Sequence, residues 1–194
     1  MLNTSFPTRQ PVRLSLRVWV CCVVLNMFLC GEAGSEVYFS KEEAMELAFG
    51  KSGLEIEPKP VFLSETQVDA IQKQAHTKLE SSLYTVYVGK SDGVPQTYAF
   101  IDAQKVRTQQ QTLLIVMDRL GRLSKIEILA FHEPPEYRSP ARWLNTLAGR
   151  SYSELLPNQG IDAISGATLS CHSSLELARR ALAIVQIGLL QDTH

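Results

Sequence analysis

Small and hydroxyl-bearing residues gather immediately before the last predicted helix of the chain. They form the run Asp162-Ala-Ile-Ser165-Gly166-Ala167-Thr168, followed by Ser170. A helix N-terminus carries unpaired N–H groups and the positive end of the helix dipole, which together favour an anion such as phosphate. Gly166 and Ala167 leave room for a ligand, and hydroxyls such as that of Thr168 can bind it. The residue types alone therefore predict an anion pocket, although ordinary turn and N-cap chemistry uses the same pattern.

The segment Asp162 to Thr168 resembles the flavinylation pattern of the FMN-binding domain family, which reads Asp, two residues, Ser or Thr, Gly, Ala, Thr. That family includes the FMN-carrying subunits of the sodium-pumping NADH:quinone reductase and of Rnf-type ferredoxin oxidoreductases. There a dedicated flavin transferase joins FMN through its phosphate to the hydroxyl of the last threonine. The resemblance implies FMN held covalently by a phosphoester at Thr168. The recognised sequence would comprise Asp162, Ser165, Gly166 and Ala167.

The resemblance extends over about Tyr84 to Leu190. Residues 115–126 look like the family's strand, Asp/Gly turn and strand, and His132-Glu133 and Trp143 follow before the motif. Ser170, which adds a hydroxyl after the motif, and Glu133, which lies beside the proline loop, are further candidates for binding FMN. The segment after the turn differs from the respiratory subunits, where it tends to read His-x-Glu-Thr with glycines, because this chain has His132-Glu-Pro-Pro-Glu-Tyr137.

Other reactive side chains have simpler interpretations. His132 and Glu133 could face the flavin or bind a metal, but two adjacent ligands are too few for a metal site, so surface or packing roles are favoured. Trp143 and Tyr137 could stack on a flavin, with core packing favoured for Trp143. Nothing in the sequence identifies a third member for a catalytic triad with Cys171 and His172. The segment around Ser165 lacks the Gly-x-Ser-x-Gly pattern of a hydrolase nucleophile, so an exported Ser or Cys hydrolase is disfavoured.

The N-terminus has the pattern of a secretory signal peptide. Three arginines precede the apolar run 18–29, and small residues follow it at 31–35. We expect cleavage after Ala33, leaving an FMN-binding domain over 34–194. The alternatives are a retained membrane anchor and lipid attachment at Cys30. Cleavage would remove Cys21, Cys22 and Cys30 and leave no partner for a disulfide with Cys171.

Length and composition indicate one globular domain. The chain has 194 residues, of which 45% are hydrophobic and 20% charged, with a net charge of -1. No basic, aromatic-interleaved face is present, which argues against binding to nucleic acid.

The pattern of elements predicts an α+β fold. Capping boxes at Ser40 and Ser64 predict two helices, the first of which ends at Gly50. A short helix is expected over 141–147, after an irregular proline loop at 134–140. In the last helix, apolar residues recur from Leu175, while Arg179 and Arg180 lie off that stripe. Strands are expected at 83–88, 97–101, 112–117 and 123–131, with a hairpin at 118–121. The sum is a single domain with a twisted, mainly antiparallel sheet packed by helices.

The function predicted from these features is that of an extracytoplasmic electron carrier with covalent FMN, rather than a stand-alone enzyme. Its expected partners are a flavin transferase and a membrane or extracytoplasmic redox protein. The expected location is the periplasm or the outer face of the cytoplasmic membrane. The alternative is a non-redox module of the same fold that binds an anion, a non-covalent flavin or a protein.

Overall fold

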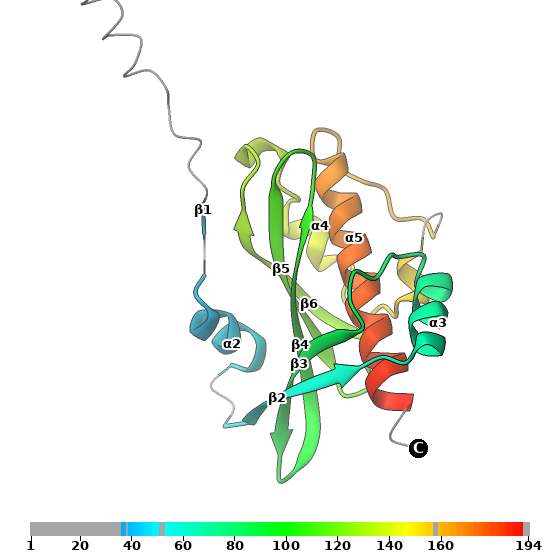
Figure 1. Ribbon diagram of the computed structural model, residues 1–194. Helices are drawn as coiled ribbons and strands as arrows, with labels where there is room; N and C mark the ends of the chain where they lie inside the picture. Colours follow the sequence, from blue (N-terminus) through cyan, green and yellow to red (C-terminus); the bar gives the residue numbers. More distant parts are fainter. Residues whose placement is uncertain (1–35, 38, 51–52, 157–158, 192–194) are drawn as a thin grey trace, which may run out of the picture. The chain divides into compact units, whose positions relative to one another are not determined.

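The sheet is the frame on which the motif is mounted. The computed structural model of the protein describes residues 36–37, 39–50, 53–156 and 159–191. Strand order is β1-β6-β5-β4-β3-β2, and every neighbouring pair is antiparallel (Figure 1). The strands are β1 (Glu36–Val37), β2 (Glu55–Phe62), β3 (Leu83–Ser91), β4 (Val94–Lys105), β5 (Gln110–Asp118) and β6 (Leu123–Phe131). The predicted leader 1–33, with Cys21, Cys22 and Cys30, lies outside the described residues, as does the boundary after Ala33.

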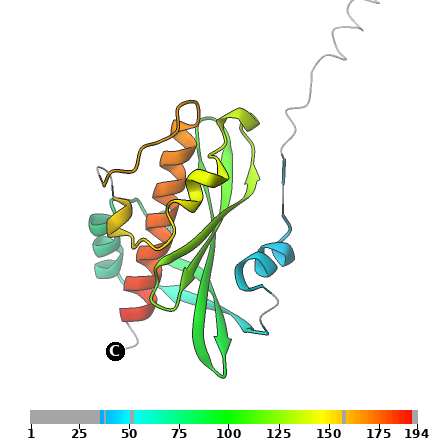
Figure 2. The same ribbon diagram turned by 180° about the vertical axis from the view of Figure 1, so that it is seen from behind.

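Helices cover the two faces of the sheet unequally (Figures 1 and 2). One face carries α3, α4 and α5, and the other carries α2. Their bounds are α2 (Lys41–Phe49), α3 (Glu65–Ala75), α4 (Ala141–Asn145) and α5 (Thr168–Ala183), which continues as the π-helical η3 (Ile184–Leu190). Two short 3-10 helices, η1 (Pro135–Tyr137) and η2 (Ser153–Leu155), lie in the connections.

Strand β5 runs through the middle of the sheet and is buried on both faces. Leu113, Ile115 and Met117 face the core under α5, whereas Leu114 and Val116 face the smaller core under α2. Successive side chains of a strand point to opposite faces, so a strand covered on both sides becomes a continuous apolar run.

All four predicted strands are confirmed, most of them a few residues longer than expected. The hairpin between β5 and β6 is confirmed as well. The N–H of Gly121 donates to the carbonyl of Asp118, and the Asp118 carboxylate accepts from Leu120 N and Arg122 N. Gly121 has φ +71°, a conformation that glycine adopts without strain.

Both predicted capping boxes are present. Ser40 accepts the N–H of Glu43, whose carboxylate accepts the N–H of Ser40, and Ser64 and Gln67 make the same reciprocal pair at the start of α3. Gly50 ends α2 as expected.

The last helix is confirmed but begins earlier than its apolar stripe, at Thr168. Arg179 and Arg180, which lie off that stripe, are nevertheless each only 7% exposed. Arg179 donates to the carbonyls of Ala75 and Leu155, and Arg180 binds Asp102. Polar contacts therefore bury this helix beyond its apolar stripe, and hydrophobic periodicity does not detect them.

Strand β2 has no counterpart among the expected elements. Its sequence, Glu-Ile-Glu-Pro-Lys-Pro-Val-Phe, contains two prolines and buries only Val61. Among the described strands it pairs with β3 alone, where Pro58 lies opposite Tyr87 and Pro60 opposite Thr85. An edge strand tolerates proline because its outer side needs no N–H donor. The described residues thus form a single α+β domain with an antiparallel sheet, as predicted. Within them no helix is long and apolar enough to span a membrane.

Candidate functional site

The N-terminus of α5 presents backbone donors to the surface. Ala167 occupies the N-cap and its methyl group can accept no hydrogen bond. Its own N–H donates to the carbonyl of Ile164, and its carbonyl accepts from Cys171 N. Among the described residues, no acceptor binds the N–H groups of Thr168, Leu169 and Ser170. These three donors, at the positive end of a 16-residue helix, can hold an anion.

Thr168 is exposed and stands in the first turn of this helix. Its hydroxyl donates to the carbonyl of Ile164 at 3.3 Å, a long hydrogen bond that costs little to break. Gly166, two residues earlier, has φ +86°. A glycine takes that conformation without strain and places no side chain beside the threonine.

A hollow of about 180 Å³ lies beside Thr168, and we call it the Thr168 hollow. Three segments meet there: the turn after β4, the loop after β6 and the start of α5. Its lining consists of Val106, Arg107, Glu133, Tyr137, Gly166, Ala167, Thr168, Leu169 and Ser170. The structure thus brings together five of the seven residues predicted to bind the cofactor.

Glu133 lines the hollow, but its carboxylate is already engaged. Oε1 accepts the N–H groups of Arg107 at 3.1 Å and of Gln109 at 2.8 Å, together with that of Thr108 between them. The Thr108 hydroxyl lies 3.3 Å from both carboxylate oxygens. The backbone donors of Gln109 and Thr108 stabilise the charged form and hold the pKa of Glu133 below its ordinary value, and the burial of this residue opposes them.

The remaining two predicted residues lie outside the hollow. Asp162 and Ser165 have exposed side chains in the loop before α5. The carbonyl of Asp162 accepts the indole N–H of Trp143 at 2.8 Å, which ties this loop to α4. Trp143 itself is 6% exposed and belongs to the core, as favoured from the sequence. The hydroxyl of Ser170 points to the backbone carbonyls of Ala167 and Tyr137.

The residues next to the motif form no second reactive group. Cys171 is buried with the Ser139 hydroxyl 3.6 Å from its sulfur, and His172 is exposed. Within the described part of the chain, no three side chains of His, Cys, Asp or Glu gather where they could hold a metal ion. His132 is partly buried, and its backbone N–H donates to Gln110.

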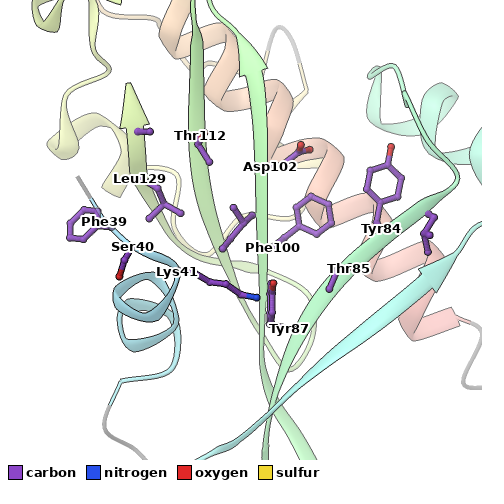
Figure 3. A pocket seen from close by; sticks show the side chains of 13 residues that line it. Phe39, Ser40, Lys41, Tyr84, Thr85, Tyr87, Phe100, Asp102, Thr112 and Leu129 are labelled. Atoms are coloured by element: carbon purple, nitrogen blue, oxygen red, sulfur yellow. The ribbon is translucent and has the colours of Figure 1, made fainter. Parts of the chain in front are cut away.

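A larger hollow, of about 610 Å³, opens where β3 and β4 separate (Figure 3). Their pairing ends at Tyr87 and Ala99, although β4 continues to Lys105. Figure 3 shows Tyr84 and Phe100 pointing toward each other between the diverging strands, and their ring centroids are 5.9 Å apart. This hollow contains no residue of the motif.

Residues 109–183 match the model of one known family, described as the FMN-binding domain. This segment belongs to the FMN-binding domain family. The match includes Glu133 and the whole Asp162–Thr168 motif, and it confirms the resemblance seen in the sequence over the greater part of its length. Neither a curated protein nor a solved structure matches the chain.

The geometry beside Thr168 fits the phosphate end of FMN. Three N–H groups that have no acceptor among the described residues belong to residues that line the hollow together with Arg107. Pockets that enclose a whole cofactor usually measure about 300–1,000 Å³. The Thr168 hollow is smaller, so it accommodates a phosphate and its nearest atoms rather than the entire flavin.

Proposed function

We propose that this protein is an extracytoplasmic electron-transfer flavoprotein that carries FMN covalently through a phosphoester at Thr168. One observation carries the proposal: an exposed threonine hydroxyl, inside a segment of the FMN-binding domain family, stands at the end of a helix beside three free backbone donors. These donors would bind the phosphate oxygens while the hydroxyl oxygen bonds to phosphorus.

Attachment requires help from outside the chain. When the Oγ1–phosphorus bond forms, the hydroxyl loses its proton and the bond from phosphorus to the donor's leaving group breaks. Glu133 supplies the carboxylate that lines the hollow. Its pKa is lowered and backbone donors bind it, which makes it a poor base. A flavin transferase would therefore supply the base and the activated FMN donor.

Once attached, FMN supplies the electron transfer, and the protein binds and orients it. The chain needs no catalytic side chain for that role. Residues 1–33 have the pattern of a signal peptide, which supports a position in the periplasm or on the outer face of the membrane. The redox partner would then be a membrane or extracytoplasmic protein.

The test is the intact mass of the full chain produced with and without a flavin transferase. We expect a gain equal to FMN less one water, a denatured band that fluoresces under ultraviolet light, and loss of both in Thr168→Val. Thr66→Val, an exposed threonine in the first turn of α3, is the matched control and should load fully. An unchanged mass, or an adduct that survives Thr168→Val, contradicts the proposal. A flavin that washes away on denaturation favours the non-covalent alternative.

The electron-transfer role has its own test. Chemical reduction of the loaded protein should bleach the flavin absorbance reversibly, and oxidised acceptors should restore it without release of the cofactor. A loaded protein whose flavin cannot be reoxidised by any soluble or membrane acceptor would count against a carrier role while leaving the attachment intact.

A further inference from the structure

Arg107 belongs to the turn 106–109 after β4, and Glu133 belongs to the loop after β6. Hydrogen bonds from the turn to the Glu133 carboxylate hold the two segments together at the Thr168 hollow. The backbone N–H of Arg107 donates to the Glu133 carboxylate, and Arg107 is one of the residues that line the hollow. We infer that Glu133 is a positioning residue: it fixes the turn 106–109 so that the Arg107 guanidinium meets the phosphate on Thr168. This inference rests on the proposed function, because it assigns two residues to the same phosphate.

The turn depends on Glu133 for its conformation. Val106 N donates to the carbonyl of Gln109 at 2.9 Å, which closes the turn. The next three N–H groups converge on Oε1 of Glu133 from one side, so that a single buried carboxylate satisfies them all. Glu133 is 7% exposed, whereas Arg107, Thr108 and Gln109 are exposed and have little packing of their own. Removing the carboxylate would release the turn.

Two sets of backbone donors therefore lie in or next to the lining of the hollow, and within the described residues only one of them has no acceptor. The set at 107–109 already binds an anion, the Glu133 carboxylate. The set at 168–170 has no acceptor among the described residues. A concave group of N–H donors binds phosphate and carboxylate alike, so an incoming phosphate is directed to the second set.

Among the described residues that line the hollow, Arg107 is the only cation. Its guanidinium makes no hydrogen bond or ion pair with any residue of the described ranges, and it is exposed. A guanidinium binds phosphate oxygens through charge-assisted hydrogen bonds and offsets the charge of the nearby carboxylate. Arg107 lies two residues before the segment that matches the family model, so that match does not assign it.

The variant Glu133→Gln distinguishes two roles of this carboxylate, because positioning of the turn and repulsion of the phosphate change the rate of FMN transfer in opposite directions. If the carboxylate acted only as a negative charge near the phosphate, Glu133→Gln would speed the transfer of FMN to Thr168. If it holds the turn, Glu133→Gln slows transfer and Glu133→Ala slows it further, because the amide keeps one oxygen acceptor and alanine keeps none.

The experiment measures the rate of FMN transfer to Thr168 by intact mass, using the full chain, one transferase and limiting flavin donor. Arg107→Ala should lower the rate about tenfold, the loss expected for one charge-assisted hydrogen bond, and Arg107→Lys should recover part of it. Glu133→Gln should slow transfer in the wild-type background and change nothing further in the Arg107→Ala background. Amide hydrogen exchange should show that Glu133→Gln selectively deprotects Arg107, Thr108 and Gln109.

Two variants serve as matched controls. Arg119→Ala removes an exposed arginine from the turn at the other end of β5, and Glu154→Gln removes a carboxylate that accepts Ser151 N in a loop away from Thr168. Both should load at the wild-type rate. Three results would each overturn the inference: additive effects of the Arg107 and Glu133 changes, faster loading of Glu133→Gln, or loading of Arg107→Ala at the full rate. In each of these cases the proposed function still stands, provided that the wild-type chain loads FMN. A wild-type chain that never loads overturns both.

Discussion

Arg180 donates two guanidinium hydrogen bonds, from Nε at 2.9 Å and from Nη2 at 2.6 Å, to one carboxylate oxygen of Asp102. The other carboxylate oxygen accepts the N–H of Ala103 at 2.8 Å. The N–H of Val106 donates to Gln109, on the β5 side of β4. Backbone N–H groups alternate between the two sides of a strand, so the N–H of Ala103 points to the opposite side, where β3 no longer pairs with β4. Asp102 therefore links the sheet to α5 and also satisfies a backbone donor at the free edge of β4.

Asp102→Ala should lower the free energy of unfolding by about 2–4 kcal/mol. It leaves the Arg180 guanidinium, on a side chain that is only 9% exposed, without its partner, and it frees the Ala103 N–H. Urea denaturation of residues 34–194 measures the loss. The control is Lys125→Ala, which breaks an ion pair with Glu127 whose side chains are 36% and 34% exposed, and it should change stability by less than about 1 kcal/mol. Equal losses in the two variants would contradict the assigned role of Asp102.

Glu133 gives stability a defined dependence on pH. Its pKa in the folded protein lies below the ordinary value of 4.5, chiefly because Gln109 N and Thr108 N bind the charged carboxylate. A lowered folded pKa means that the contribution is complete above about pH 4.5 and is lost as the pH falls through the folded pKa. The difference in unfolding free energy between wild type and Glu133→Gln should therefore be largest near neutral pH and shrink in acid.

Urea denaturation at about pH 7 and about pH 3 compares the two proteins in both limits. Glu136→Gln, an exposed glutamate in η1, provides the control and should follow the wild type at both values. A difference between wild type and Glu133→Gln that grows in acid would show that the backbone donors do not favour the charged carboxylate.

Elements whose signals are local could be predicted from the sequence. Capping boxes, apolar periodicity and the Asp118–Gly121 turn depend on residues within a few positions of one another, and each of them is present. Strand β2 was missed because Pro58 and Pro60 normally argue against a strand, and only its place at the edge of the sheet permits them.

The candidate site was predictable in its motif and not in its surroundings. Thr168, Gly166 and Ala167 stand together in the chain, so a resemblance could find them. Glu133 was named as a cofactor ligand, but its binding to the turn 106–109 joins residues 24 to 26 positions apart. Arg107 carried no signal at all, because an exposed arginine in a turn is ordinary. Only the folded arrangement brings it to Thr168.

The hydrogen bond from Trp143 to the carbonyl of Asp162 should hold the motif in place. Trp143→Phe keeps an aromatic ring in the core but removes the indole N–H donor. We expect a loss of about 1–2 kcal/mol in the free energy of unfolding, and faster amide exchange at the motif residues before α5. Tyr152→Phe removes a hydroxyl that donates to the exposed side chain of Gln74 while keeping the partly buried ring, and it should leave the motif protected. Unchanged exchange in Trp143→Phe would indicate that the loop is held by other contacts.

Gly188 allows the C-terminal helix to approach β2. A β-carbon at this position would lie 2.4 Å from Leu63 Cδ2 and 3.1 Å from Val61 Cγ1. Alanine normally stabilises a helix relative to glycine by up to about 1 kcal/mol. Here the clash should prevail, and Gly188→Ala should destabilise the protein by about 1–3 kcal/mol in urea denaturation. Leu63→Ala opens space at the point of contact, so the double variant should lose less stability than the sum of the two single changes. Strict additivity, or a stabilised Gly188→Ala, would mean that the helix and β2 are not packed as closely as the structure has them.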